Sequence, residues 1–129
     1  NEEFVLMLLD LDNFKNVNDT HGHLQGDDIL TSFVQLVEEC LRGTDQVFRF
    51  GGDEFVILLE KEGLNGAHIV AARINHAISQ SPIFNKFNVS TSIGCACFTK
   101  NDTPKDLFAR ADKALYAAKD AGKNCMKIA

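Results

Sequence analysis

The sequence lacks an excess of basic residues. Its 129 residues include 13 lysines and arginines against 18 aspartates and glutamates, which gives a formal net charge of −5 at pH 7. Such a chain offers no basic field to hold a long polyanionic backbone, so we expect no long nucleic acid as a partner. A nucleoside triphosphate is still compatible with this charge, provided that metal ions screen its phosphates.

Long apolar runs and targeting signals are also missing. The longest apolar run, Phe4–Leu9, is too short to span a membrane, and no signal peptide is visible. We therefore expect a cytoplasmic domain, and the sequence leaves open whether a parent protein is attached to a membrane.

None of the cysteines has the CxxC spacing of a zinc or redox motif. Cys95 and Cys97 stand two apart in a strand-like stretch, while Cys40 and Cys125 are isolated. The pattern favours small buried hydrophobic residues in a reducing compartment, with a zinc site as the alternative.

No linker, repeat or low-complexity stretch divides the chain, so residues 1–129 are interpreted as one domain. Hydrophobic periodicity predicts the order β-α-β-β-α-β-α-β, with residues 10–19 as a loop or short helix. The expected strands cover residues 4–9, 46–50, 54–60, 87–98 and 125–129, and the expected helices run from Asp27 to Gly43, through residues 67–78, and from a capping box at Thr103 to Gly122. This order predicts an α/β (α+β) fold with a mainly antiparallel five-stranded sheet flanked by helices.

Three acids fall at places where strands end. Asp10 and Asp12 follow the buried first strand, and Asp53 lies at the tip of the hairpin. If those strands are neighbours, Asp10 and Asp53 converge, and their repulsion is relieved by a divalent cation or by protonation. Oxygen ligands favour Mg²⁺ or Mn²⁺ over zinc. The alternative is that these acids are solvated turn residues.

Other motifs also allow two interpretations. Gly51 and Gly52 suit a type I′ turn, but their bare backbone also suits a bound phosphate. Lys119 and Lys123 suit the C-terminal end of a helix, or a phosphate nearby. The His21 and His23 pair has no third soft ligand near it in the sequence, which favours a structural role.

Several motifs together resemble the GGDEF family of diguanylate cyclases. They are "RFGGDEF", "DLDNFKNVNDTHGHLQGDDIL", "STSIG" and "RADKALYAAKDAGKN", in the family's order, and they extend from Val5 to Lys127. The resemblance implies a fold similar to adenylyl cyclase and polymerase palm domains. It also implies condensation of two GTP into cyclic di-GMP, with two Mg²⁺ or Mn²⁺ ions per GTP and a homodimer for catalysis.

The resemblance also implies roles for individual residues. Asp10, Asp53 and the Leu11 carbonyl would hold the metals, and Glu54 would be a further ligand or the base for the attacking 3′-hydroxyl. Contacts to substrate would come from Asn18 and Asp27 at guanine and from Phe14, Lys15, Gly51, Gly52, Lys119 and Lys123 near the phosphates. The family often has Arg where this chain has Lys123, and lysine lacks the bidentate fork of arginine. Asp27 suits guanine, because a carboxylate can accept hydrogen bonds from both N1–H and the N2 amino group.

A second motif, "RGTD", covers Arg42 to Asp45. Its offset from Gly51 matches the family's product-binding inhibitory site, and Arg73 falls at the position of that site's further arginine. The alternative is a surface ion pair, whose pairwise contribution is about 0 to 1 kcal/mol.

The family's helix and "DxLTGLxNR"-like turn before the first strand have no counterpart here. We therefore expect the chain to be the output module of a longer protein that carries sensory domains. The rival function is a catalytically silent GGDEF domain that serves as a receptor for cyclic di-GMP or GTP. The intact "GGDEF", Asp10 and Asp27 argue against silence, and Asp27 also disfavours another cyclic nucleotide as product.

Overall fold

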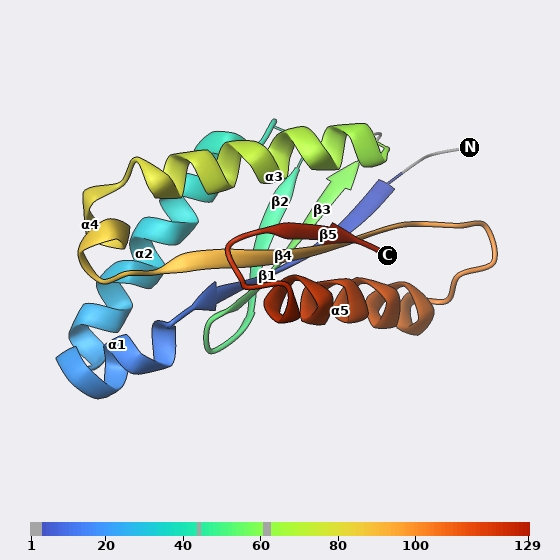
Figure 1. The fold of residues 1–129 in the computed structure, drawn as a ribbon. Helices are drawn as coiled ribbons and strands as arrows, with labels where there is room; N and C mark the ends of the chain where they lie inside the picture. Colours follow the sequence, from blue (N-terminus) through green and yellow to red (C-terminus); the bar gives the residue numbers. More distant parts are fainter. Residues whose placement is uncertain (1–3, 44, 61–62) are drawn as a thin grey trace.

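The computed structural model describes residues 4–43, 45–60 and 63–129, and all structural statements concern these residues. The elements along the chain are β1 (Phe4–Asp12), α1 (Phe14–His21), α2 (His23–Cys40), β2 (Gln46–Gly51), β3 (Glu54–Glu60), α3 (Leu64–Ser79), α4 (Pro82–Lys86), β4 (Ser90–Cys97), α5 (Pro104–Asp120) and β5 (Met126–Ile128). Figure 1 shows one sheet with α2 and α3 over one face and α5 over the other.

The five strands form one sheet in the order β2-β3-β1-β4-β5. β1 lies in the centre and pairs antiparallel with both β3 and β4, and β2 pairs antiparallel with β3. The expected five-stranded, mainly antiparallel sheet is therefore confirmed. The β4–β5 pair is parallel, because α5 crosses back along the sheet between these two strands.

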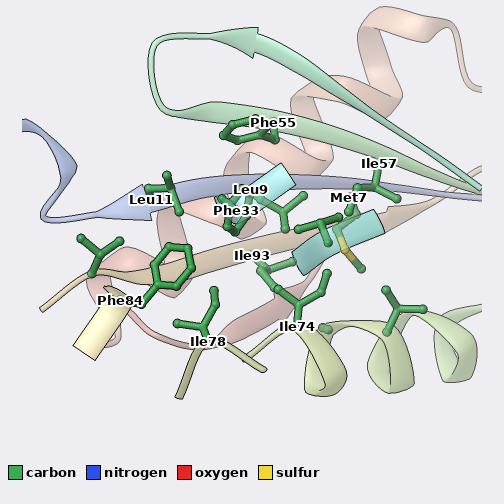
Figure 2. Close-up of a cluster of buried hydrophobic side chains, with 14 of the residues drawn as sticks. Met7, Leu9, Leu11, Phe33, Phe55, Ile57, Ile74, Ile78, Phe84 and Ile93 are labelled. Carbon is green, nitrogen blue, oxygen red and sulfur yellow. The ribbon is translucent and has the colours of Figure 1, made fainter. Parts of the chain in front are cut away.

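Strand β1 is buried on both faces, which explains the continuous apolar run in its sequence. Alternate side chains point to opposite faces, so Met7, Leu9 and Leu11 join the larger core with α2 and α3 (Figure 2), whereas Leu6 and Leu8 contact the apolar stripe of α5. The core thereby fixes which way the residues at the end of β1 point.

Helix α5 lies very close to β4. A Cβ added at Gly94 would come within 2.1 Å of the Leu115 backbone nitrogen and 2.5 Å of the Ala111 carbonyl oxygen. Only glycine allows this approach. The expected capping box is present at the start of α5, where Thr103 and Asp106 bond to each other's backbone N–H.

Several boundaries differ from the sequence prediction, and one helix was missed. β1 continues to Asp12 instead of ending at Leu9, β4 begins at Ser90 instead of residue 87, and α3 begins at Leu64 instead of residue 67. Helix α2 begins at His23, so the prediction that it begins at Asp27 was wrong. The first turns of α2 are exposed except at Gly26, and hydrophobic periodicity therefore could not mark them. The short helix α4 was not predicted, because its five residues are too few to show a period.

Candidate active site

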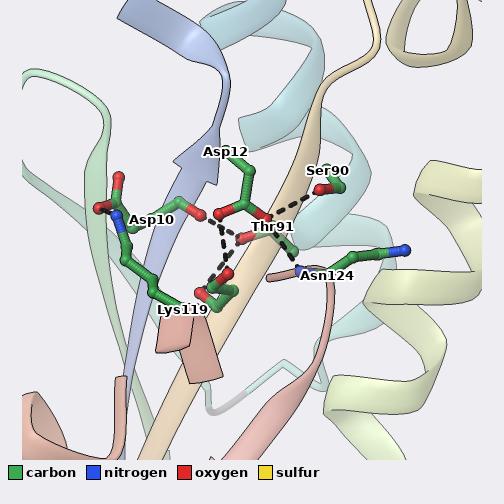
Figure 3. Close-up of polar contacts among 7 residues, drawn as sticks. Asp10, Asp12, Ser90, Thr91, Lys119 and Asn124 are labelled. Carbon is green, nitrogen blue, oxygen red and sulfur yellow. Dashed lines mark hydrogen bonds and ion pairs between the residues drawn. The ribbon is translucent and has the colours of Figure 1, made fainter. Parts of the chain in front are cut away.

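The candidate acids gather where β1 ends. Asp10 is 7% exposed and lies on the face of β1 that α5 covers. Its Oδ2 forms an ion pair with the ammonium group of Lys119, in the last turn of α5. Figure 3 shows this pair beside Asp12, so the end of α5 lies next to the two acids at the end of β1.

The hairpin turn between β2 and β3 reaches the same point. The Leu11 N–H donates to the Asp53 carbonyl oxygen at 3.1 Å, and Asp10 is the register partner of Glu54. The structure therefore brings Asp10, Asp53 and Glu54 together from two distant segments. Asp53 is half-buried and Glu54 is exposed.

Asp10 is held in an environment that disfavours its negative charge. Burial above all, and then repulsion by the Asp53 carboxylate, raise the pKa of Asp10 to about 6, although Lys119 opposes this shift. Oδ1 of Asp10 is buried and accepts no hydrogen bond from any residue that the structure describes. For Lys119, burial disfavours the charge, but the contact with Asp10 outweighs it and the pKa is raised.

These features fit a hard divalent cation. The described residues contain no cluster of three or more histidine, cysteine or acidic side chains arranged to hold a metal. Mg²⁺, however, is commonly held by one or two carboxylates together with substrate phosphates. The unpartnered Oδ1 of Asp10, the nearby Asp53 and the Leu11 carbonyl supply oxygen ligands of that kind, so the residues fit the ion.

The turn itself exposes its backbone. Gly52 has a φ of 45°, and a Cβ added at Gly51 or Gly52 would meet no atom within 4 Å. The guanidinium group of Arg49 donates to the Gly52 carbonyl at 2.7 and 3.0 Å and holds the turn in place. Sequence reasoning assigned no role to Arg49, because hairpin geometry alone brings it to that carbonyl.

The candidate guanine contacts lie at the junction of α1 and α2. The Asn18 side chain packs directly on Gly26, where an added Cβ would come within 1.8 Å of Asn18 Oδ1. That oxygen is buried and has no hydrogen-bond partner among the described residues. Asp27 follows Gly26, is exposed and lies inside α2. It therefore does not cap the helix.

Helix α1 presents its first turn near the end of β1. The Phe14 side chain is buried in the core, so only its backbone is available to a ligand, whereas Lys15 is exposed. The preceding residue, Asn13, has a φ of 72° and makes no side-chain cap. Its amide instead donates to the carbonyls of Phe87 and Asn88. The first N–H groups of α1 thus receive no side-chain cap from the part of the chain that the structure describes.

Asp12 was placed by sequence beside Asp10 but was given no role. In the structure it is 5% exposed and accepts three hydrogen bonds, from the hydroxyls of Ser90 and Ser92, both at 2.8 Å, and from the Asn124 N–H at 3.1 Å (Figure 3). No sequence signal distinguishes Asp12 from Asp10, because their opposite environments arise from β4 and from the end of α5.

The described residues of the RGTD motif, Arg42, Gly43 and Asp45, lie at the other end of the hairpin, where β2 begins and β3 ends. The Asp45 carboxylate is buried and accepts from the backbone N–H groups of Arg42 and Glu60, at 3.4 and 3.3 Å. The Arg42 Nε is 3.9 Å from Asp45 Oδ2. Arg73, on α3, donates to the Cys40 carbonyl at 3.4 Å. Arg42 and Asp45 line an open pocket of about 420 Å³.

Comparison with known proteins places this geometry in a family. The family model "Diguanylate cyclase, GGDEF domain" matches residues 1–125. The chain belongs to the GGDEF family. It is 42% identical over 123 residues to diguanylate cyclase DgcS of Shewanella oneidensis, covering 95% of this chain and 41% of that protein. This chain spans less than half the length of the curated relatives it matches.

Solved structures of GGDEF domains have the same fold. The GGDEF domain of YfiN, also named TpbB, from Pseudomonas aeruginosa is 34% identical with a TM-score of 0.91, over 99% of this chain and 83% of that one. The GGDEF domain of DgcB from Caulobacter crescentus, solved in complex with c-di-GMP, is 26% identical with a TM-score of 0.83, over 98% of this chain and 78% of that one. No helix among the described residues is long and apolar enough to cross a membrane.

The environment of Asp10 predicts a dependence of stability on pH. A folded-state pKa of about 6, above the ordinary 3.8, means that folding favours the protonated form. The contribution of Asp10 to the free energy of unfolding is therefore fully present below pH 3.8 and is lost as the pH rises through 6. Without metal, the unfolding free energy of the parent chain should therefore fall, relative to that of Asp10→Asn, between pH 4 and pH 7.

Urea denaturation in a chelating buffer measures this difference. Asp102→Asn is the control, because the Thr99 backbone N–H and Arg110 lower the pKa of Asp102, so its contribution is lost as the pH falls. A constant difference between the parent and Asp10→Asn across pH 4–7 would contradict the assigned environment of Asp10.

Proposed function

We propose that this chain is a diguanylate cyclase domain that condenses two GTP into cyclic di-GMP and releases pyrophosphate. The observation that carries the proposal is the buried, partly unsatisfied Asp10 carboxylate at the point where the Asp53 turn and Lys119 meet. Membership of the GGDEF family and the names of the relatives support the same activity.

Asp10, Asp53 and the Leu11 carbonyl would hold two Mg²⁺ or Mn²⁺ ions per GTP, with Glu54 as a further ligand. Such ions, when bound, lower the pKa of the attacking 3′-hydroxyl and neutralise charge on the α-phosphate and the leaving pyrophosphate. Glu54 is exposed and opposite Asp10 in the register, so its carboxylate could instead accept the hydroxyl proton. These two roles for Glu54 are alternatives.

The phosphates would lie against the open backbone of Gly51 and Gly52 and the first N–H groups of α1, including that of Phe14. Lys15, Lys119 and Lys123 would supply positive charge around them, from the start of α1 and the end of α5. The triphosphate would then span the gap between these two helix ends, beside the metal acids.

The guanine base would bind at the junction of α1 and α2. The buried Asn18 oxygen has no donor among the described residues, and the exposed Asp27 carboxylate can accept from N1–H and the N2 amino group. Adenine offers no such pair of donors on that edge. One domain would hold one GTP, so a homodimer would have to align two sites to close the cyclic product. Sensory domains in the full-length protein would control this alignment.

The Arg42, Asp45 and Arg73 region would bind the product as an inhibitor. Arginine can stack on guanine and can also bond its O6 and N7. Asp45 already accepts two backbone N–H groups, so its first role is to shape the pocket beside Arg42, and guanine donors would share its oxygens. The complex of the DgcB GGDEF domain with c-di-GMP supports the choice of this ligand.

The metal assignment is tested by Asp53→Asn. In the full-length protein, loss of this ligand charge should lower cyclic di-GMP synthesis from GTP to below about 1% of the parent rate, with the fold intact because Asp53 lies at a turn. Asp28→Asn, an exposed acid on α2, is the matched control and should leave the rate unchanged. Near-normal synthesis by Asp53→Asn would refute the metal assignment. If the unmutated full-length protein binds nucleotide but makes no cyclic di-GMP, the domain is a receptor.

The base assignment is tested by Asp27→Ser. A hydroxyl cannot accept both guanine donors, so guanine binding should weaken by about 1.5 to 3 kcal/mol and the preference for GTP over ATP should relax. Competition binding with the two nucleotides measures the ratio, with Asp28→Ser as the control. An unchanged ratio would exclude Asp27 from base recognition.

The inhibitory site is tested by Arg42→Ala. Loss of the guanidinium group should weaken cyclic di-GMP binding by about tenfold or more, since a good guanine contact contributes about 1 to 3 kcal/mol. Calorimetry with cyclic di-GMP measures the affinity, and Lys113→Ala, an exposed cation on α5, is the control. Equal affinities of Arg42→Ala and the parent would mean that "RGTD" is only a surface turn.

A further inference from the structure

The loop that follows α5 has an unusual backbone. Gly122, Lys123 and Asn124 have φ values of 117°, 67° and 52°, so three successive residues are left-handed and two of them carry a Cβ. Asparagine and glycine adopt this backbone readily, but it is unfavourable for Lys123 and persists there only where surrounding contacts hold it. The loop also carries Lys123, a candidate phosphate contact.

The backbone N–H groups of the three left-handed residues each donate a hydrogen bond. Those of Gly122 and Lys123 donate to the carbonyls of Lys119 and Ala118, at 3.2 and 3.0 Å, which attaches the loop only to its own helix. The Asn124 N–H donates to Asp12 Oδ2 at 3.1 Å, which attaches it to β1. Of these three, only the bond to Asp12 ties the loop to the strand that carries the metal acids.

Asp12 is itself fixed in position. Its carboxylate is buried, and the hydroxyls of Ser90 and Ser92 on β4 each donate to one of its two oxygens. All three donors to Asp12, including the Asn124 N–H, are neutral groups (Figure 3). The carboxylate therefore acts as a rigid acceptor whose geometry is set by two neighbouring strands.

Asp10 and Asp12 stand two residues apart on β1 and so lie on the same face. Asp10 meets Lys119 in the last turn of α5, and Asp12 meets Asn124 just beyond that helix. If Asp10 turns its oxygens to a cation, its contact with Lys119 weakens. The hydrogen bond between Asp12 and the uncharged Asn124 N–H does not depend on Asp10, so it can persist while substrate is bound.

We propose that Asp12 is a positioning residue that holds loop 122–124, and with it Lys123, against the β- and γ-phosphates of the substrate. The inference rests on the proposed function, since it takes a nucleoside triphosphate as the ligand. It predicts that Asp12 contributes to binding of the triphosphate rather than to binding of the base.

The experiment compares the affinities of GTP and GMP, each with Mg²⁺, for the parent chain and for variants at Asp12. Asp12→Ala should weaken GTP binding by about tenfold and GMP binding by less than about twofold, because GMP lacks the phosphates that Lys123 would contact. Asp12→Asn should restore most of the GTP affinity. Its amide oxygen can accept from Asn124, and its NH₂ group can donate to the Ser92 hydroxyl.

Ser92→Ala is the matched control. It removes one buried hydrogen bond of Asp12 but leaves the contact with Asn124, so the ratio of the GTP and GMP affinities should not change. Hydrogen exchange of the Asn124 amide gives a second measurement that needs no nucleotide. Exchange should accelerate in Asp12→Ala, whereas the amides of β1 should keep their protection. If Asp12→Ala does not fold, Asp12→Ser takes its place, as its hydroxyl fills part of the same space.

The outcomes separate this inference from the proposed function. If the parent chain binds GTP no more tightly than GMP, the proposed function is contradicted. If the parent prefers GTP and Asp12→Ala keeps the same preference, or weakens both nucleotides equally, Asp12 is only a structural residue. An Asn124 amide that exchanges freely in the parent chain would also overturn the proposal.

Discussion

The burial of β1 on both faces is the constraint on which the site depends. This strand has a neighbour on each side and helices over each face, so its register and side-chain alternation cannot slip without exposing one core or the other. On the face toward α5, Asp10 and Asp12 continue the alternation of Leu6 and Leu8. Their direction toward α5 therefore follows from Leu6 and Leu8, which contact that helix. The packing of the hydrophobic core therefore both stabilises the fold and sets the face of the sheet to which the two acids point.

Asp10 and Asp12 are two buried carboxylates on one strand, and their hydrogen-bonding environments differ. Asp12 accepts three hydrogen bonds from neutral donors, which satisfy its charge. Asp10 has one oxygen without a partner among the described residues, a raised pKa and a second carboxylate nearby. A stabilising arrangement would have satisfied both. Of these two neighbouring acids, only Asp10 lies in an environment that destabilises its charge. Such a local cost to stability is typical of residues that bind a ligand.

The sequence could predict the sheet, the long helices and the approach of Asp53 to Asp10, because strong hydrophobic periods and a hairpin motif encode them. It could not predict where α2 begins, since the residues from His23 to Asp27 are mostly exposed and carry no period. It could not separate Asp12 from Asp10 or find the Arg49 contact with Gly52. Those contacts depend on which segment folds beside each residue, and Asp45 likewise gained the Glu60 N–H as a partner only through the closed hairpin.

The hairpin also limits how a ligand at Arg42 could act on the metal acids. Asp45 bonds to the Glu60 N–H where β2 begins and β3 ends, and Arg49 and the Leu11 N–H hold the turn at the other end. Between these points β2 and β3 are paired, and β3 is paired along its length with buried β1. Among the described residues this ladder is continuous except for a register shift between Arg49 and Gly51, so we expect a small shift at Arg42 to be damped before it reaches Asp53. Under the proposed function, product bound at Arg42 would therefore inhibit by holding two domains apart, so that each active site stays intact while the two GTP molecules cannot meet.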